Sequence, residues 1–145
     1  MQTLGDLKIL VVEDLDSDFQ FTNDCLTEIG LSCSRATTLL DAASKIGGEQ
    51  WDVVLLDLCL PDSQGLDTVK AVHKLLDESK YESAPIVVLS GINDFAISKE
   101  ALKLGAKDYL VKGEYGPHEL TRAITFVTLT ASCPRRTEKK AFGLF

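Results

Sequence analysis

The chain has 145 residues, of which 45% are hydrophobic and 26% are charged. That length suits one domain with one buried core, and the apolar fraction excludes a disordered chain. The formal net charge of −7 argues against direct nucleic-acid binding by this domain, because phosphate contacts need lysine and arginine. No apolar run reaches the roughly 18 residues of a membrane span, and no basic segment opens a signal peptide. We therefore expect a cytoplasmic protein without membrane contact, whose cysteines Cys25, Cys33, Cys59 and Cys133 are free thiols.

Short apolar runs mark the expected strands. Residues 9–12, 53–56 and 86–89 are unbroken runs rich in β-branched residues. Such runs are typical of parallel strands that are buried on both faces between helices. Two weaker segments, 32–36 and 108–111, complete the set, and the first of these is expected at a sheet edge.

Helical spacings of apolar residues separate these runs. The first falls within residues 19–29 and the second places Leu39, Ala43 and Ile46 on one face. Three more cover residues 66–76, 101–104 and 120–127. The order is strand then helix, repeated five times. Because right-handed crossovers join parallel strands, this order predicts an α/β fold, a doubly wound five-stranded sheet with helices on both faces.

The charge changes sign near the end of the pattern. Residues 1–127 carry 11 basic and 21 acidic side chains, whereas residues 128–145 carry 4 basic and 1 acidic. We expect one domain over residues 1–127. Residues 128–145 then form the end of the last helix and a basic tail or linker.

Reactive side chains follow four of the five expected strands. Ligands of open α/β sheets bind at the carboxyl ends of the strands, so side chains just past those ends should meet. The residues that stand there are Glu13, Asp14, Asp57, Ser90 and Lys112. Three carboxylates, one hydroxyl and one ammonium group are therefore expected at one rim.

The carboxylates indicate a metal ion. Crowded carboxylates repel one another unless a cation lies among them, and Mg²⁺ prefers hard oxygen ligands. We expect Asp14 and Asp57 to bind Mg²⁺ directly and Glu13 to bind it directly or through water. The backbone carbonyl of Cys59 would add a further oxygen.

Asp57 has a second potential role as a nucleophile. An aspartate carboxylate can attack phosphorus and hold the group as an acyl phosphate. Lys112 and the metal would offset charge on the phosphoryl oxygens, and Ser90 could donate a hydrogen bond to one of them. Gly91 would leave space for the group beside this hydroxyl.

Four motifs together resemble a known family. They are Val-Val-Glu-Asp at 11–14, Leu-Leu-Asp-Leu-Cys-Leu-Pro-Asp-Ser-Gln-Gly at 55–65, Val-Leu-Ser-Gly at 88–91 and Gly-Ala-Lys-Asp-Tyr-Leu-Val-Lys at 105–112. In this order and spacing they resemble the receiver domain of bacterial response regulators, the CheY-like fold. The resemblance covers about residues 7–127 and implies the strand order 2-1-3-4-5.

The resemblance implies a signalling module of a two-component phosphorelay rather than an ordinary enzyme. Asp57 would take a phosphoryl group from a histidine kinase or a histidine phosphotransfer protein. Glu13 and Asp14 would hold Mg²⁺, Lys112 would contact the phosphoryl group, and Ser90 and Tyr109 would be the switch residues. The output surface would be the fourth helix, fifth strand and fifth helix. This surface would serve a downstream effector protein, a fused output domain or a homodimer.

One departure from the family pattern, at Gly113, and two positions that flank the phosphate site affect expectations. Gly113 follows Lys112 where many members have a proline that is often cis, and a glycine peptide is expected to be trans. Cys59 and Ile92 stand where members tune the phosphoryl lifetime. Since neither side chain is a strong base, we expect slow self-dephosphorylation.

Two other functions compete with this interpretation. A phosphatase of the haloacid-dehalogenase type would use Asp14 as nucleophile and Asp16 as acid/base, with Ser90 and Lys112 as later motifs. It lacks a further acidic motif after the lysine, because Asp108 is the last aspartate. The other alternative is a pseudo-receiver that binds partners without phosphorylation, against which the complete set of acids, hydroxyl and lysine argues.

Overall fold

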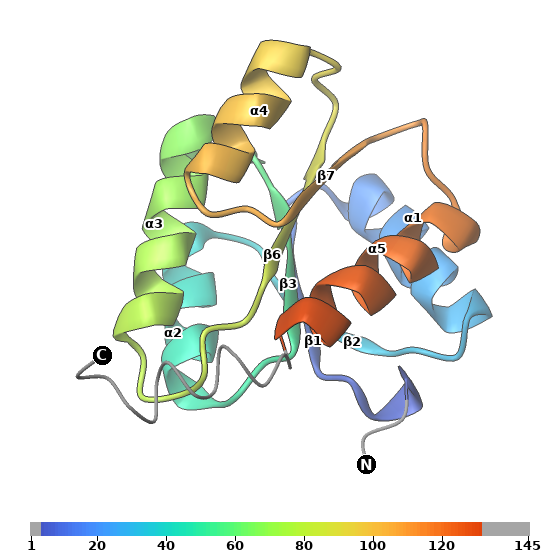
Figure 1. Ribbon diagram of the computed structural model, residues 1–145, viewed down its shortest axis with the longest axis horizontal. Coiled ribbons are helices and arrows are strands. Elements are labelled where there is room, and N and C mark those ends of the chain that lie inside the picture. Colours follow the sequence, from blue (N-terminus) through green and yellow to red (C-terminus); the bar gives the residue numbers. More distant parts are fainter. Residues whose placement is uncertain (1–3, 132–145) are drawn as a thin grey trace.

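Five parallel strands form a central sheet, and helices cover both of its faces (Figure 1). This computed structural model describes residues 4–131. The strands of the sheet are β1 (Ile9–Val12), β2 (Cys33–Ala36), β3 (Val53–Asp57), β6 (Ile86–Ser90) and β7 (Asp108–Val111). Their spatial order, β2-β1-β3-β6-β7, is the expected order 2-1-3-4-5 when these five are numbered among themselves. The predicted fold class is confirmed.

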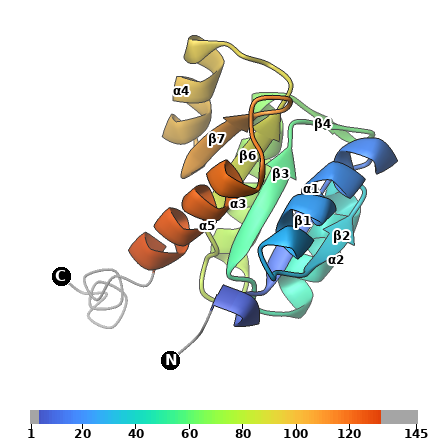
Figure 2. The ribbon, with the colours of Figure 1, turned by 90° about the vertical axis from the view of Figure 1, so that its right-hand side faces the viewer.

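The helices divide into two layers, which lie on either side of the sheet in Figure 1, and Figure 2 views the layer of α1 and α5 in front of the sheet. One layer holds α1 (Asp16–Glu28) and α5 (Pro117–Ala131), and the other holds α2 (Leu39–Gly48), α3 (Leu66–Glu78) and α4 (Phe95–Lys103). Alternate residues of each central strand face opposite layers. In β3, Val54 and Leu56 belong to the core under α2 and α3, whereas Val53 and Leu55 belong to the core under α1 and α5.

Burial follows the position of each strand in the sheet. Every residue of β1, β3 and β6 is buried, which matches the unbroken apolar runs from which these strands were predicted. β2 is an edge strand, as expected, and β7 is the other edge, with all four of its residues half-buried. The three central strands are therefore held in the buried core, and the residues that directly follow them start from fixed positions.

Small elements and one helix face differ from the expectations. A 3₁₀ turn, η1, covers Leu4–Asp6, and a short antiparallel hairpin pairs β4 (Cys59–Leu60) with β5 (Ser63–Gln64). Each hairpin strand has two residues, too few for a hydrophobic period to show. On α2 the buried alanine is Ala42, not the expected Ala43, which is half-buried.

The peptide bonds of residues 4–131 are all trans, and Gly113 has a φ of +87°. That conformation lies in the left-handed region, which glycine adopts at no steric cost. The expected trans glycine after Lys112 is therefore observed.

No helix within residues 4–131 is long and apolar enough to cross a membrane. α5 runs to Ala131, the last described residue. The predictions for the tail beyond it, and for the thiol of Cys133, lie outside the described residues. Cys25, Cys33 and Cys59 are free thiols.

Candidate functional site

The register of the sheet brings the predicted site residues to one edge. Val12 of β1 lies beside Leu56 of β3, so Glu13 and Asp57 follow at the same level. Asp57 lies beside Leu89 of β6, and Ser90 lies beside Val111 of β7, which precedes Lys112. The carboxyl ends of four parallel strands therefore present these side chains at adjacent positions.

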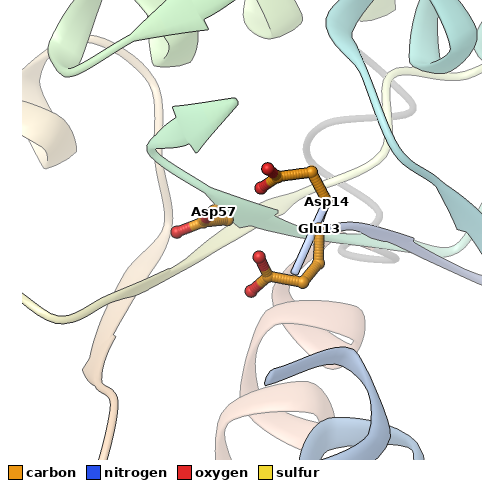
Figure 3. A group of neighbouring side chains, drawn as sticks. All are labelled: Glu13, Asp14 and Asp57. Atoms are coloured by element: carbon orange, nitrogen blue, oxygen red, sulfur yellow. The ribbon is translucent and has the colours of Figure 1, made fainter. Parts of the chain in front are cut away.

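Three carboxylates form one acidic cluster. Oxygen atoms of Glu13, Asp14 and Asp57 all lie within 4.8 Å of one another, and Figure 3 shows the carboxylates of Glu13 and Asp14 on the side of their loop towards Asp57. Glu13 and Asp57 are 3% and 6% exposed, whereas Asp14 is open to solvent. Burial raises the pKa of Glu13 to about 7, helped by repulsion from Asp57 and opposed by Lys112. The cluster is thus crowded enough to favour a cation.

Lys112 supplies a positive charge to this cluster. Its Nζ lies 3.1 Å from Asp57 Oδ1, 2.6 Å from Glu13 Oε1 and 2.8 Å from Asp18 Oδ2. Burial by itself would lower the pKa of Lys112, but hydrogen bonds to Asp18 and Glu13 and the charge of Asp57 outweigh it and raise this pKa. The lysine is held as an ammonium ion beside Asp57.

The edge strand β2 braces the loop that carries Glu13. The backbone N–H of Glu13 donates to the carbonyl of Ala36 at 2.9 Å. Arg35 Nε donates to the carbonyl of Glu13 at 3.0 Å, and Arg35 Nη1 pairs with Asp16 Oδ1 at 2.9 Å. These contacts fix the backbone of the acidic loop on the side away from Asp57's strand.

Ser90 and Tyr109 both form a hydrogen bond with the backbone of Ile92, in the loop after β6. Ser90 is 2% exposed, and its Oγ accepts a hydrogen bond from the Ile92 N–H at 3.1 Å. The half-buried Tyr109 donates its hydroxyl to the Ile92 carbonyl at 2.8 Å. A Cβ placed on Gly91 would meet no atom within 4 Å apart from its two chain neighbours, so this position is open. That the open space receives the phosphoryl group stays a prediction.

Cys59 lies in the hairpin that follows Asp57. It is exposed, and its thiol donates to Gln64 Oε1 at 3.3 Å. The metal-binding role expected for its carbonyl stays a prediction.

The donors present fit a hard divalent cation. All three members of the cluster offer carboxylate oxygens, the ligand type that Mg²⁺ prefers, and the exposed Asp14 leaves one side open to water or a phosphate oxygen. The same side chains leave Asp57 beside an ammonium group, the arrangement that stabilises charge on a transferring phosphoryl group.

The sequence analysis did not predict two side chains of the site, Asp18 and Arg35. Asp18 stands in the first turn of α1, where a carboxylate is ordinary because it complements the helix dipole. Arg35 stands on an edge strand, where an arginine is equally ordinary. A single sequence does not indicate that either residue belongs to the site, because both contacts depend on how α1 and β2 pack against the strand ends.

Fold and site together are those of a phosphoacceptor receiver module of two-component signalling. The family model of the response regulator receiver domain matches residues 9–125. The chain belongs to this family, whose members are signalling modules that generally bind Mg²⁺.

Individual relatives agree with this assignment. The chain is 29% identical to the chemotaxis protein CheY of Thermotoga maritima over 122 residues, which are 83% of this chain and 97% of CheY. It is 33% identical to the probable transcriptional regulator ycf27 of Guillardia theta over 94% of its own length, but spans only 48% of that relative. The receiver domain of Francisella response regulator 1452 superposes with a TM-score of 0.74 at 25% identity, covering 87% of this chain and 99% of that one.

The family assignment favours the receiver over both alternatives. The geometry adds a reason against the phosphatase, because its required acid/base, Asp16, has a side chain 94% exposed and paired with Arg35. Within residues 4–131, Asp16 is not part of the acidic cluster.

Proposed function

We propose that Asp57 is the phosphoacceptor of this receiver. The observation that carries the proposal is the 3.1 Å contact between Lys112 Nζ and Asp57 Oδ1 at the edge of the acidic cluster. The buried Asp57 carboxylate thus has an ammonium group in contact with it and two further carboxylates within 4.8 Å. Asp14 is exposed and has no such ammonium contact among the described ion pairs, so it is the poorer nucleophile.

The transfer step follows from these positions. A carboxylate oxygen of Asp57 attacks the phosphorus of a phosphohistidine, and the new O–P bond forms as the N–P bond breaks. The electron pair of the N–P bond stays on the leaving imidazole nitrogen, which takes a proton from water. Lys112 donates to a phosphoryl oxygen and offsets its charge. The donor is a histidine kinase or a histidine phosphotransfer protein.

Mg²⁺ would be held by Asp14 and Asp57, with Glu13 binding directly or through water and the Cys59 carbonyl as a further ligand. When bound, the ion supplies charge neutralisation for the phosphoryl oxygens. The protein's own part is to keep the carboxylates together, which the contacts of Ala36 and Arg35 to the Glu13 backbone support.

Ser90 and Tyr109 would report phosphorylation to the surface. Drawing Ser90 Oγ towards a phosphoryl oxygen would break its bond to the Ile92 N–H, and Tyr109 is tied to the carbonyl of that same residue. The signal would leave through α4, β7 and α5, to an effector, a fused output domain or a second copy. Large apolar side chains stand exposed on α4 and α5, with Phe95 at 81% and Phe126 at 61% exposure.

The domain limits stay part of the proposal. Residues 1–127 would form the receiver, and residues 128–145 would be the end of α5 followed by a basic tail or linker. The relative ycf27 is about twice as long as the stretch matched here, which supports an output region in proteins of this type. The cytoplasmic location expected from the sequence also belongs to this proposal.

Incubation with acetyl phosphate and Mg²⁺, followed by intact mass measurement, tests the proposed function. We expect the wild type to gain one phosphoryl group and Asp57→Asn to gain none, with the exposed Asp67→Asn as a control that behaves like the wild type. After removal of the donor, the same measurement gives the lifetime, which Cys59 and Ile92 predict to be long. Steady release of phosphate without a modified protein would instead support a phosphatase.

Titration calorimetry with Mg²⁺ tests the metal ligands. Asp14→Asn removes one negative oxygen ligand, so its affinity for Mg²⁺ should fall by about tenfold or more relative to the wild type. Asp24→Asn carries the same charge change two turns along α1, outside the cluster, and should bind almost as the wild type does. Equal affinities of Asp14→Asn and wild type would remove Asp14 as a ligand.

A further inference from the structure

The ammonium group of Lys112 has one partner that does not belong to the acidic cluster. An ammonium group has three N–H donors, and Lys112 Nζ lies within hydrogen-bond distance of three carboxylates. Glu13 and Asp57 are members of the cluster. Asp18, at 2.8 Å, comes from the first turn of α1, 94 residues away in the chain.

Asp18 is built into the scaffold rather than into a loop. Its backbone carbonyl accepts from Thr22 Oγ1 at 3.2 Å, and the same hydroxyl makes a buried 2.9 Å hydrogen bond with Tyr115 of the segment before α5. The Asp18 side chain is 36% exposed and the Lys112 side chain 21%. The pair therefore joins α1 to the loop after β7, partly shielded from water.

The partners of Lys112 differ in what happens to them in the proposed reaction. Glu13 and Asp57 would share their oxygens with Mg²⁺, and Asp57 would also receive the phosphoryl group. A lysine has four flexible methylene groups, and immobilising such a side chain costs up to about 2 kcal/mol. Of its three carboxylates, only Asp18 would keep its oxygens for Lys112 throughout the reaction.

We propose that Asp18 is a positioning residue that holds the Lys112 ammonium group against Asp57 while Glu13 and Asp57 engage the metal and the phosphoryl group. This inference rests on the proposed function. It assigns Asp18 no contact with the metal or the phosphoryl group, since its effect acts through Lys112. One N–H of the ammonium stays on Asp18, and another is thereby aimed at the phosphoryl oxygens.

The rate of Mg²⁺-dependent phosphorylation by acetyl phosphate, measured by intact mass, tests the inference. Asp18→Asn should be phosphorylated about tenfold more slowly than the wild type, because small displacements of a reacting group reduce rates steeply. Asp24→Asn is the matched control: it makes the same charge change on the same helix, where Asp24 bonds only Gln20 among the described side chains. Its rate should stay within about twofold of the wild type.

A double-mutant cycle with Lys112 separates positioning from a general electrostatic effect. If Asp18 acts through Lys112, Asp18→Asn should have no further effect in a Lys112→Met background. Mg²⁺ affinity should be the same in Asp18→Asn and Asp24→Asn, since neither residue is assigned as a ligand. Asp18→Glu keeps the carboxylate and should recover part of the rate.

Three results would overturn the inference. Equal rates for Asp18→Asn and Asp24→Asn would show that the contact is an ordinary surface ion pair. An undiminished effect of Asp18→Asn without Lys112, or a selective loss of Mg²⁺ affinity, would show that Asp18 acts directly on the metal or the donor. A wild type that takes up no phosphoryl group would overturn the proposed function itself, and this inference with it.

Discussion

The formal charges around Lys112 give a physical reason for the metal ion of the proposed function. Glu13, Asp14, Asp18 and Asp57 contribute four carboxylates against one ammonium group. An incoming phosphoryl donor is itself anionic, so a bare cluster would repel it. A bound divalent cation would offset two of these negative charges, and in the proposed function Lys112 then contacts the phosphoryl oxygens.

Gly91 provides a test of where the phosphoryl group is proposed to bind. A Cβ at this position meets no atom within 4 Å, so Gly91→Val should fold with nearly wild-type stability. Its branched side chain would nevertheless stand beside Ser90, and we expect phosphorylation by acetyl phosphate to slow by about tenfold or more. Thermal unfolding and intact mass measure the two effects separately. A variant that is phosphorylated at the wild-type rate would show that the group binds elsewhere.

Single residues at strand ends were predictable, and residues brought by helix packing were not. Glu13, Asp57, Ser90 and Lys112 each follow an apolar run, and parallel strands deliver such positions to one edge. Asp18 reaches Lys112 only because α1 packs beside the loop after β7. No spacing along the chain encodes that contact, so sequence reasoning had no means of finding it.

Asp62 links the hairpin after Asp57 to a neighbouring helix. Its two carboxylate oxygens accept from the backbone N–H groups of Leu39 and Leu40, at 2.8 Å and 3.0 Å, at the start of α2. These bonds lower the pKa of Asp62. Thr38 caps the same helix through the N–H of Asp41. The segment expected to carry a metal ligand at Cys59 is thus fastened to α2.

Replacing Asp62 should therefore destabilise the fold in a pH-dependent way. Because the folded-state pKa is lowered, the stabilisation is present above the unfolded pKa and is lost as pH falls through the folded one. We expect Asp62→Ala to lower the melting temperature by about 3 °C at neutral pH. The difference should shrink as the pH falls below about 4, the ordinary pKa of an aspartate, as followed by circular dichroism. A difference that persists at the acid end would contradict the capping role.

The contact between α3 and the turn after α4 depends on Gly105. Its φ is +119°, and a Cβ there would lie 2.7 Å from the His73 ring of α3. Gly30 ends α1 with a φ of +82° but has open space around it. The two glycines share a left-handed backbone and differ in crowding.

Urea unfolding of alanine variants can separate these two causes. Gly30→Ala should cost roughly 1 kcal/mol for the backbone conformation alone. Gly105→Ala should cost about 2 kcal/mol or more because the methyl group also meets the His73 ring. Adding His73→Ala to Gly105→Ala should restore part of the loss. If the second substitution restores nothing, backbone strain alone sets the cost at Gly105.

At the level of elements, the long apolar runs predicted the strands that they form, whereas the two-residue strands could not be predicted. The buried strands β1, β3 and β6 lie where their runs predicted them, because burial on both faces demands continuous apolar sequence. The β4–β5 hairpin has two residues in each strand and leaves no such trace. On α2, the buried face turns to Ala42 because packing against α3 and the sheet sets the helix rotation.

Across the whole molecule, the packed core and the candidate site occupy different parts of the sheet. Two apolar cores, one on each face, hold the strands, whereas the site is made by residues just past the strand ends. Hydrogen bonds join Ser90 and Tyr109 of β7 to Ile92 in the loop after β6, and in the proposed function this loop carries a change at Asp57 to α4, β7 and α5. The fold therefore suits a module whose surface responds to one covalent event.

The most direct test of this account is to locate the phosphoryl group. After incubation with acetyl phosphate and Mg²⁺, borohydride converts an aspartyl phosphate to homoserine, which peptide mass spectrometry assigns to a residue. We predict homoserine at position 57 in the wild type, and none anywhere in Asp57→Asn or without Mg²⁺. Homoserine at position 14, or an undiminished signal in Asp57→Asn, would contradict the account.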